Sequence, residues 1–226
     1  EYDAFVFDIT QPGQNPGVMA TGRFSTSGGI VTFRPHINRH DNNFNFLNGN
    51  RYQISLRTDA RIYSRSFVQD GANLAYAWNG DVNGTDFGIH TGLSVINATT
   101  LLPVWQKQYV FTPASSTGIL MNKVLPDNTG YLGQGMWPTI TTNDGAMAGE
   151  MFFLRTDKQG NPQWSIKLAN VLINERSHNA GFLLEGGYIY AVGFKYSAVT
   201  TKYTGCLVQV SQTTGAMNPG CAPIQQ

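Results

Sequence analysis

The feature that most constrains the fold of this chain is an internal repeat with a step of 57 residues. Four short segments align when the sequence is shifted by that step, and Met19, Tyr76, Gly133 and Tyr190 hold the same place in them. Four steps account for almost all of the 226 residues. A fixed step of a few tens of residues indicates one structural unit used repeatedly. The predicted repeats are approximately residues 1–56, 57–113, 114–170 and 171–226.

Two further columns support the repeat. Apolar segments follow the first column at residues 29–33, 92–96, 150–154 and 205–210, and a third column holds Trp105, Trp164 and Cys221. Each repeat is predicted to form four short strands bounded by Gly, Asn, Thr or Pro. In the last repeat we expect them at residues 179–184, 187–195, 205–210 and 216–221. Four antiparallel strands repeated radially describe an all-β fold, a small β-propeller of four blades in one domain.

Two other arrangements fit the same pattern. One is a β-sandwich whose strands recur, and the other is a segment of a larger propeller. The first repeat is the least regular, because residues 3–9 must supply its inner strand across a turn-rich Gln11-Pro12-Gly13. Its last strand is predicted at either residues 43–47 or residues 51–56.

The composition also favours strands over helices. Charged residues make up 13% and aromatic residues 12%, and no segment carries a sustained helical stripe of apolar residues. The formal charge of +1 gives no general attraction to nucleic acid or an anionic membrane. No apolar run reaches 18 residues, so membrane insertion is not expected. The chain begins at Glu1 without a basic and apolar leader, which fits a mature secreted chain or a fragment.

The third repeat resembles a known family. Its segment from Met151 to Lys167 has an apolar strand ending in Arg155-Thr156-Asp157, a turn through Gly160-Asn161 and a return through Trp164-Ser165. This segment is similar to the repeat of bacterial secreted β-propeller proteins, and residues 185–193 and 3–6 resemble other parts of that family. The resemblance implies an extracellular scaffold role. The matched residues are structural, because Gly160-Asn161 suits a hairpin turn and Trp164 a packing aromatic.

The two cysteines are predicted to form a disulfide. The midpoint between Cys206 and Cys221 falls between Thr213 and Thr214, inside a polar turn, so the cysteines face each other across a hairpin. Closing that loop stabilises the fold by about 3 kcal/mol in the chain-entropy model. The bridge would indicate an oxidising, extracellular compartment. The alternative is a pair of buried thiols.

A calcium loop is the one metal site that the sequence suggests, and we otherwise expect no cofactor. Oxygen-bearing side chains alternate before a glycine at Asn79, Asp81, Asn83 and Asp86. His90 stands where a distal acidic ligand belongs, so a plain Asn-Gly turn is the alternative. Asn83 and Asn97 begin glycosylation sequons, which matter only in a eukaryote. His36 and His40 beside Asp41 have the spacing of metal ligands on a helix, but lie in a predicted strand or loop.

An arginine-rich segment is a candidate ligand surface. Six of the nine arginines lie between residues 34 and 67, among aromatic residues. Strand alternation would put Arg61, Tyr63, Arg65 and Phe67 on one face, with Arg57 nearby, a pattern able to bind an anionic glycan or single-stranded nucleic acid. The alternative is a solvated strand whose arginines discourage edge pairing. Nucleic acid is the less favoured of these ligands.

A polar cluster, Glu175, Arg176 and His178, enters the last repeat and could face the mouth of a propeller channel. The alternative is a turn between blades. Motifs for a serine nucleophile, a zinc protease or a phosphate loop are absent from the sequence. A glycosidase pair of carboxylates would have to be assembled from separate segments, for instance from Glu175 and Asp144.

These observations favour a non-catalytic, extracellular structural or interaction protein, a unit of a cell-surface or filamentous assembly. Residues 3–9 could add to the sheet edge of a neighbouring copy, so protein partners or self-assembly are expected. The first alternative is a glycan-binding lectin that uses Trp78, Trp137 or Tyr131. The second is a glycan-acting hydrolase.

Overall fold

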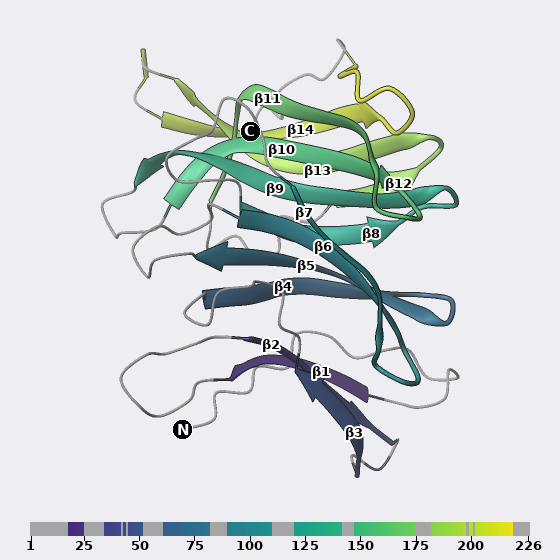
Figure 1. The fold of residues 1–226 in the computed structure, drawn as a ribbon. Coiled ribbons are helices and arrows are strands. Elements are labelled where there is room, and N and C mark those ends of the chain that lie inside the picture. Colours follow the sequence, from purple (N-terminus) through teal and green to yellow (C-terminus); the bar gives the residue numbers. More distant parts are fainter. Residues whose placement is uncertain are drawn as a thin grey trace. The chain divides into compact units, whose positions relative to one another are not determined.

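The structure is a computed structural model. It describes residues 18–24, 34–41, 43, 45–51, 61–81, 90–109, 120–141, 147–174, 182–197, 199–200 and 202–218. Every regular element in these ranges is a β-strand, numbered β1 to β14 (Figure 1). The all-β fold class is therefore confirmed. The chain divides into two compact units, residues 1–126 and 127–226.

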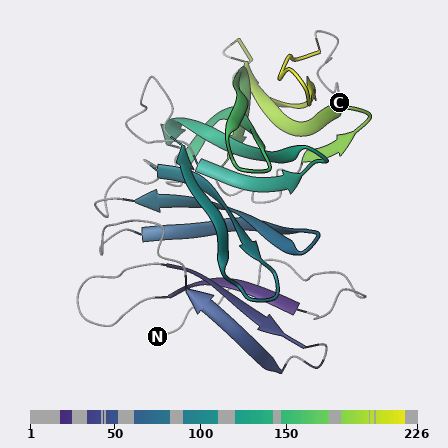
Figure 2. The same cartoon turned by 45° about the vertical axis from the view of Figure 1, so that its right-hand side comes forward.

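Unit 1 holds two antiparallel sheets in which strands adjacent in sequence pair with each other. Strands β1 to β3 form one sheet, and β4 to β7 form the other as a meander, seen as the blue strands of Figure 2. Such hairpin-linked strands need only short turns. The strands of unit 1 are β1 (Val18–Phe24), β2 (Arg34–His40), β3 (Phe46–Arg51), β4 (Arg61–Asp70), β5 (Asn73–Asp81), β6 (His90–Asn97), β7 (Pro103–Tyr109) and β8 (Leu120–Pro126).

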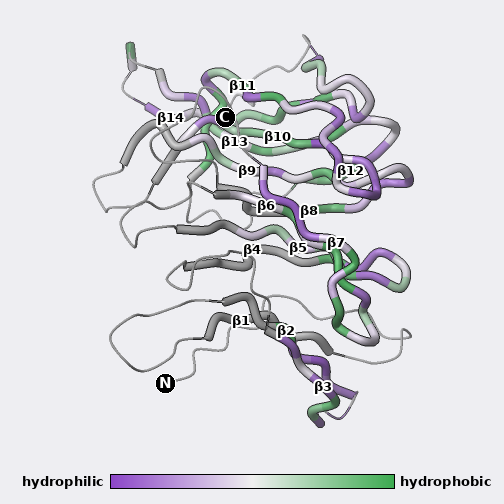
Figure 3. Tube along the Cα trace, in the orientation of Figure 1, coloured by the Kyte–Doolittle hydropathy of each residue, from purple (hydrophilic) through white to green (hydrophobic). Residues whose placement is uncertain are grey.

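Unit 2 is also built from antiparallel strands. Strands β9, β10 and β11 form a meander, β12, β13 and β14 form a second one, and a pairing of Leu172 with Phe194 joins β11 to β13. The apolar centre of β10, Met151 to Leu154, is green in Figure 3 and buried on both faces. The strands are β9 (Gly130–Thr141), β10 (Met147–Asp157), β11 (Pro162–Asn174), β12 (Phe182–Glu185), β13 (Tyr188–Ser197) and β14 (Lys202–Ser211).

The 57-residue column falls on equivalent strands. Met19 lies in β1, Tyr76 in β5, Gly133 in β9 and Tyr190 in β13, and each of these strands pairs antiparallel with the strand that follows it. The third column also holds where the structure describes it. Trp105 of β7 pairs with Val95, and Trp164 of β11 pairs with Arg155. The repeat therefore reflects a recurring strand order, whereas the prediction of one domain with those four boundaries stays a prediction.

The turn after the third strand of each repeat starts with a capping side chain, and the turns come in two alternating types. In the first type, the N–H of Asp41 donates to Asn45 O and that of Asp157 donates to Asn161 O, both at 2.9 Å. Each aspartate also accepts bonds from two backbone N–H groups and one asparagine side chain of its turn. These bonds let the turn satisfy its own polar groups.

The second turn type occurs after β6 and β14. The N–H of Asn97 donates to Leu102 O and that of Ser211 donates to Ala216 O, each across five residues. The fourth residue after each cap has positive φ, Leu101 at 57° and Gly215 at 73°. Since the two types alternate along the chain, each unit contains one turn of each type. The strand order therefore recurs in every repeat, whereas the turn type recurs in every second repeat.

An arginine and a second donor link the two turns of each unit. In unit 1, Arg39 Nη1 and Asn48 Nδ2 donate to the carbonyl oxygen of Thr99, at 2.8 and 3.2 Å. In unit 2, Arg155 Nη1 and Trp164 Nε1 donate to the carbonyl oxygen of Gln212, the latter at 3.0 Å. Arg155 is nine-tenths buried and also forms an ion pair with Asp127 at 3.0 Å. The third-repeat motif is thus structural, and Arg39-His40-Asp41 is its counterpart in the first repeat.

Apolar clusters lie behind these turns in each unit. In unit 1, Ile37 of β2 packs in one cluster with residues of the β5–β6 hairpin, including Leu74, Tyr76 and Trp78. In unit 2, the ring of Phe153 meets that of Phe182 edge-on, with centroids 5.8 Å apart. Burying such side chains is the main favourable term in folding. The arginine-linked turns therefore close over apolar cores.

We predict that replacing Arg155 by Met destabilises the protein by about 3 kcal/mol, because Asp127 then lies buried without its cation. Urea denaturation measures the change in the free energy of unfolding. Lys202→Met, at an exposed position, serves as the control and should shift it by less than about 0.5 kcal/mol. An unfolding curve of Arg155→Met equal to that of the control would contradict the role given to Arg155.

The final hairpin has the register that the cysteine spacing predicts. Val210 pairs with Met217, and Asn218 N–H donates to Gln209 O, so the turn is centred between Thr213 and Thr214. Val210 and Met217 form a non-hydrogen-bonded pair, the type in which facing side chains are closest. Cys206 is buried, and it shares a strand face with Val208 and Val210. Cys221 lies outside the described residues, so the disulfide stays a prediction.

We expect the intact mass of the unreduced protein to be about 2 Da below the reduced mass, because a disulfide removes two hydrogen atoms. Alkylation without reduction should then leave Cys206 and Cys221 unmodified, and alkylation after reduction should label both. Labelling of both thiols in the unreduced, denatured chain would show that the bridge is absent.

Candidate functional site

A carboxylate, an ammonium group and an indole ring meet near one end of the sheet in unit 2. Glu150 of β10, Lys167 of β11 and Trp137 of β9 come from three neighbouring strands. The Lys167 Nζ lies 2.7 Å from Glu150 Oε2 and 5.3 Å from the centroid of the Trp137 ring. We call these three residues the Glu150 cluster.

A bulge in β11 positions the carboxylate. The register of β10 with β11 shifts between Glu150 and Met151, which pair with Leu172 and Leu168. Asn170, inside the extra loop of chain, has φ of 62° and donates its backbone N–H to Glu150 Oε1 at 3.0 Å. Bulges re-aim side chains in this way. Glu150 therefore holds the bulge while its side chain keeps some exposure to solvent.

The surroundings of Glu150 keep it ionised. Partial burial raises the pKa of its carboxyl, but the hydrogen bond from Lys167 and the Asn170 N–H lower it by more, and the net pKa is below the ordinary value. The group is consequently a carboxylate at neutral pH. It can orient a cation or a hydroxyl, but it cannot donate a proton as a general acid.

Trp137 provides the apolar part of the cluster. Its ring is half-buried and lies 6.5 Å from the ring of Phe152, between centroids. An indole that keeps some exposure to solvent can contact an apolar ligand surface while charged groups beside it bind polar ones. Of the aromatic residues that the sequence nominated for glycan contact, Trp137 is the one in such a position.

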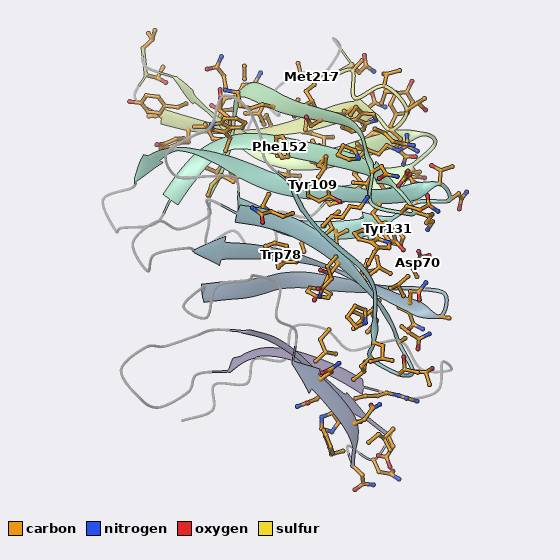
Figure 4. The ribbon with its side chains drawn as sticks, viewed as in Figure 1. Asp70, Trp78, Tyr109, Tyr131, Phe152 and Met217 are labelled. Carbon is orange, nitrogen blue, oxygen red and sulfur yellow. The ribbon has the colours of Figure 1, made fainter. Side chains whose placement is uncertain are left out.

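The other nominated aromatic residues are wrong as surface contacts. Trp78, labelled in Figure 4, is 2% exposed and donates its Nε1 hydrogen to Ser94 Oγ at 3.1 Å. Tyr131 is equally buried, with Lys158 Nζ 4.8 Å from its ring centroid. Both side chains point into apolar cores. The pattern of aromatic and small residues in the sequence did not reveal which face of each strand is buried.

The arginine segment is only partly described. Arg61, Tyr63 and Arg65 belong to β4, whose register with β5 shifts between Ser64 and Ser66. The pairing of β4 with β5 skips Arg65 at this shift. Arg57 lies outside the described residues. Binding of an anionic ligand by these residues stays a prediction.

The remaining nominated sites also stay predictions. Asn79 and Asp81 end β5, whereas Asn83 and Asp86 lie outside the described residues, as do Glu175, Arg176 and His178. Asp41 uses its carboxylate to cap its own turn, and hydrogen bonds from Asn45 lower its pKa. Within the described part of the chain, there is no group of three or more His, Cys, Asp or Glu side chains able to hold a metal. Likewise, no described helix could cross a membrane.

The sequence reasoning missed Glu150 and Lys167. Glu150 directly precedes the apolar run Met151 to Leu154 within β10, and a single carboxylate bordering such a run is the signal that could have identified it. Lys167 is the last residue of the segment that resembles the propeller family, and the residues matched in that segment indicate a structural motif. Only the pairing of β10 with β11 brings the two together.

Comparisons with known proteins give no family assignment by sequence. No protein-family model and no curated protein matches the chain. Two solved structures with similar folds are an endo-arabinase from Bacteroides thetaiotaomicron VPI-5482 and an exo-1,5-alpha-L-arabinanase from a bovine ruminal metagenomic library. Both are 11% identical with a TM-score of 0.43. The matches cover 100% and 97% of this chain and 81% and 76% of those chains.

The leading expectation of a non-catalytic structural or assembly protein is corrected by these matches. Both matched proteins carry the names of enzymes, and neither is named as a structural protein. The resemblance to secreted propeller repeats had suggested a scaffold because its matching residues are packing residues. Packing residues specify the strands and turns of a fold and are silent about its chemistry.

We predict that Glu150→Gln destabilises the protein by about 1 kcal/mol at neutral pH, because the charge-assisted bond to Lys167 is lost. The folded-state pKa of Glu150 is lowered, so its stabilising effect is present above the unfolded-state pKa and disappears as the pH falls through the folded-state value. Urea denaturation at neutral and acid pH measures this. The two proteins should converge in acid, and a constant difference would contradict the ion pair.

Proposed function

We propose that the protein is an extracellular glycan-acting hydrolase whose catalytic carboxylates are Asp144 and Glu175. Under this proposal its four repeats form the blades of a small propeller of the secreted bacterial kind, and hydrolysis needs no cofactor. The observation that carries the proposal is the register of β9, β10 and β11 at the end of the sheet that holds the Glu150 cluster.

That register brings the ends of β9 and β11, the strands that precede Asp144 and Glu175 in the sequence, close to each other. Thr141, the last residue of β9, pairs with Met147, and Asn174, the last residue of β11, pairs with Ala148. Thr141 and Asn174 thus flank the start of β10 on its two sides. Two strand spacings separate their backbones by about 10 Å. Asp144 follows Thr141 by three residues, and Glu175 follows Asn174 directly.

Asp144 and Glu175 themselves lie outside the described residues, so this distance belongs to Thr141 and Asn174, and it is within the range that glycoside hydrolysis uses. The reaction needs two carboxyl groups about 5 to 10 Å apart, one to protonate the leaving glycosidic oxygen and one to activate water or attack the anomeric carbon. One proton moves to the departing sugar, and water supplies the new hydroxyl at the anomeric carbon. The acid must have a raised pKa, which excludes Glu150 from that role because its pKa is lowered.

The Glu150 cluster would bind and orient the sugar. Trp137 offers a ring on which the apolar face of a sugar can stack, and the carboxylate of Glu150 can accept hydrogen bonds from its hydroxyls. Lys167 holds both groups in place through its contacts of 2.7 and 5.3 Å. We therefore treat Glu150 and Lys167 as positioning residues.

The test is hydrolysis of a panel of polysaccharides, arabinan among them, measured by release of reducing ends. Asp144→Asn and Glu175→Gln should each lower kcat by about 100-fold or more without unfolding the protein. Asp70→Asn, at the last residue of β4, is the matched control and should retain full activity. Hydrolysis that survives both substitutions, or a purified chain inactive on the whole panel, would overturn the proposal.

A further inference from the structure

An exposed row of aromatic side chains covers one face of β12, β13 and β14. Along β13, alternation buries Ile189 and Ala191 and leaves Tyr188, Val192 and Tyr196 between 39% and 53% exposed. The neighbouring strands add Leu183, Leu207 and Tyr203, which are 41% to 56% exposed. We call this surface, with the half-exposed Tyr190 and Phe194, the tyrosine face.

The rings on this face are held in place by one another. The centroids of Phe194 and Tyr203 lie 5.3 Å apart edge-on, and those of Tyr196 and Tyr203 lie 5.0 Å apart. At the other end, Tyr188 and Tyr190 are 6.4 Å apart. Large exposed apolar surfaces are uncommon on soluble proteins and mark sites of interaction. Because the rings are already ordered, a ligand would lose little entropy of the protein on binding.

We propose that the tyrosine face binds an uncharged polysaccharide chain and, resting on the proposed function, that it is a glycan-binding surface additional to the hydrolytic site. A glycan presents apolar C–H faces bordered by hydroxyl groups. Four of the five rings belong to tyrosines, which combine an apolar ring with a hydroxyl at its edge. Along one side, Gln209 Nε2 donates to Tyr190 Oη at 2.7 Å, and Asn218 Nδ2 donates to Gln209 Oε1 at 2.5 Å. These groups form a polar border beside the rings.

The charge of the face selects the kind of glycan. Among the described residues that β12, β13 and β14 contribute to this face, Glu185 is the one acidic or basic side chain, and it pairs with Tyr188 at the end of the row. Lys195 and Lys202 alternate to the other side of their strands. An anionic polymer would therefore find no cation among the described residues that β12, β13 and β14 contribute to this face, in contrast with the arginine-rich segment. An uncharged chain would meet no electrostatic opposition.

The length of the face selects a polymer. Tyr188 and Tyr196 are eight residues apart on one extended strand, a distance of about 27 Å. The cross-strand aliphatic pair Val192 and Leu207 separates the ring cluster at Tyr190 from the one at Phe194. Tyr190 and Phe194 lie about 13 Å apart along the strand. Two stacking platforms at that spacing suit several consecutive sugar units of one chain, whereas a single sugar would contact only one platform.

The experiment is affinity electrophoresis of the full chain in native gels containing arabinan, xylan, mixed-linkage β-glucan or galactomannan. The Glu175→Gln background is used so that hydrolysis cannot consume the ligand, and retardation does not depend on whether the chain is catalytic. We expect retardation by at least one of these uncharged polymers. Replacement of both Tyr196 and Tyr203 by Ser should weaken it by about tenfold or more. Polygalacturonate, an anionic polymer, should not retard the chain.

Phe46→Ser, which removes an exposed ring in unit 1, is the matched control and should leave retardation unchanged. Equal retardation of the tyrosine double variant and the control, or no retardation by any uncharged polymer, would overturn the proposal. Light scattering provides a further check. A mass that falls to the monomer value only in the tyrosine double variant would show that a second copy covers the face, and this too would overturn it. An unsubstituted chain that is retarded by a polymer but hydrolyses none of them would reject the proposed catalytic function alone.

Discussion

The organisation of the chain depends on one carbonyl group in each unit that receives two hydrogen bonds from the preceding hairpin. Arg39 and Asn48 donate to Thr99 O, and Arg155 and Trp164 donate to Gln212 O. An arginine suits this position because its planar guanidinium can bond the carbonyl of the next turn while another nitrogen serves a second partner. For Arg155 that partner is Asp127. The bonds fix neighbouring hairpins in relation to each other, so their apolar faces meet in one orientation.

The alternation of turn types explains why the chain behaves as two pairs of repeats. Asp41 and Asp157 begin short turns in which the cap satisfies the local backbone, and the arginine two residues before each one is free to reach the next hairpin. Asn97 and Ser211 begin the longer turns, in which a backbone carbonyl group accepts the hydrogen bond from that arginine. A donor turn and an acceptor turn make one complete unit. The division into two compact units at residue 126 follows from this pairing.

The two candidate binding surfaces of unit 2 differ in their physical character. At the Glu150 cluster, an ion pair and a bulge hold one ring beside a carboxylate, which suits recognition of a sugar at a reacting bond. On the tyrosine face the rings hold one another, and the hydrogen-bonded side chains of Gln209 and Asn218 border them. The first arrangement favours precision at one sugar unit, and the second favours a longer chain with tolerance for its position. Both surfaces are features that the proposed glycan-acting hydrolase would use.

The sequence by itself determined the strand order, the step of the repeat and the register of the final hairpin. These are local properties, set by alternation, turn residues and spacing, and they are visible at Met19, Tyr76, Gly133 and Tyr190 and around Thr213. What only the tertiary structure decided is which side chains meet across strands. It buried Trp78 and Tyr131, interrupted β4 at Arg65, and joined Glu150 to Lys167 and Trp137. The physical reason is that bulges and hairpin contacts depend on residues far apart in sequence, so no local pattern contains them.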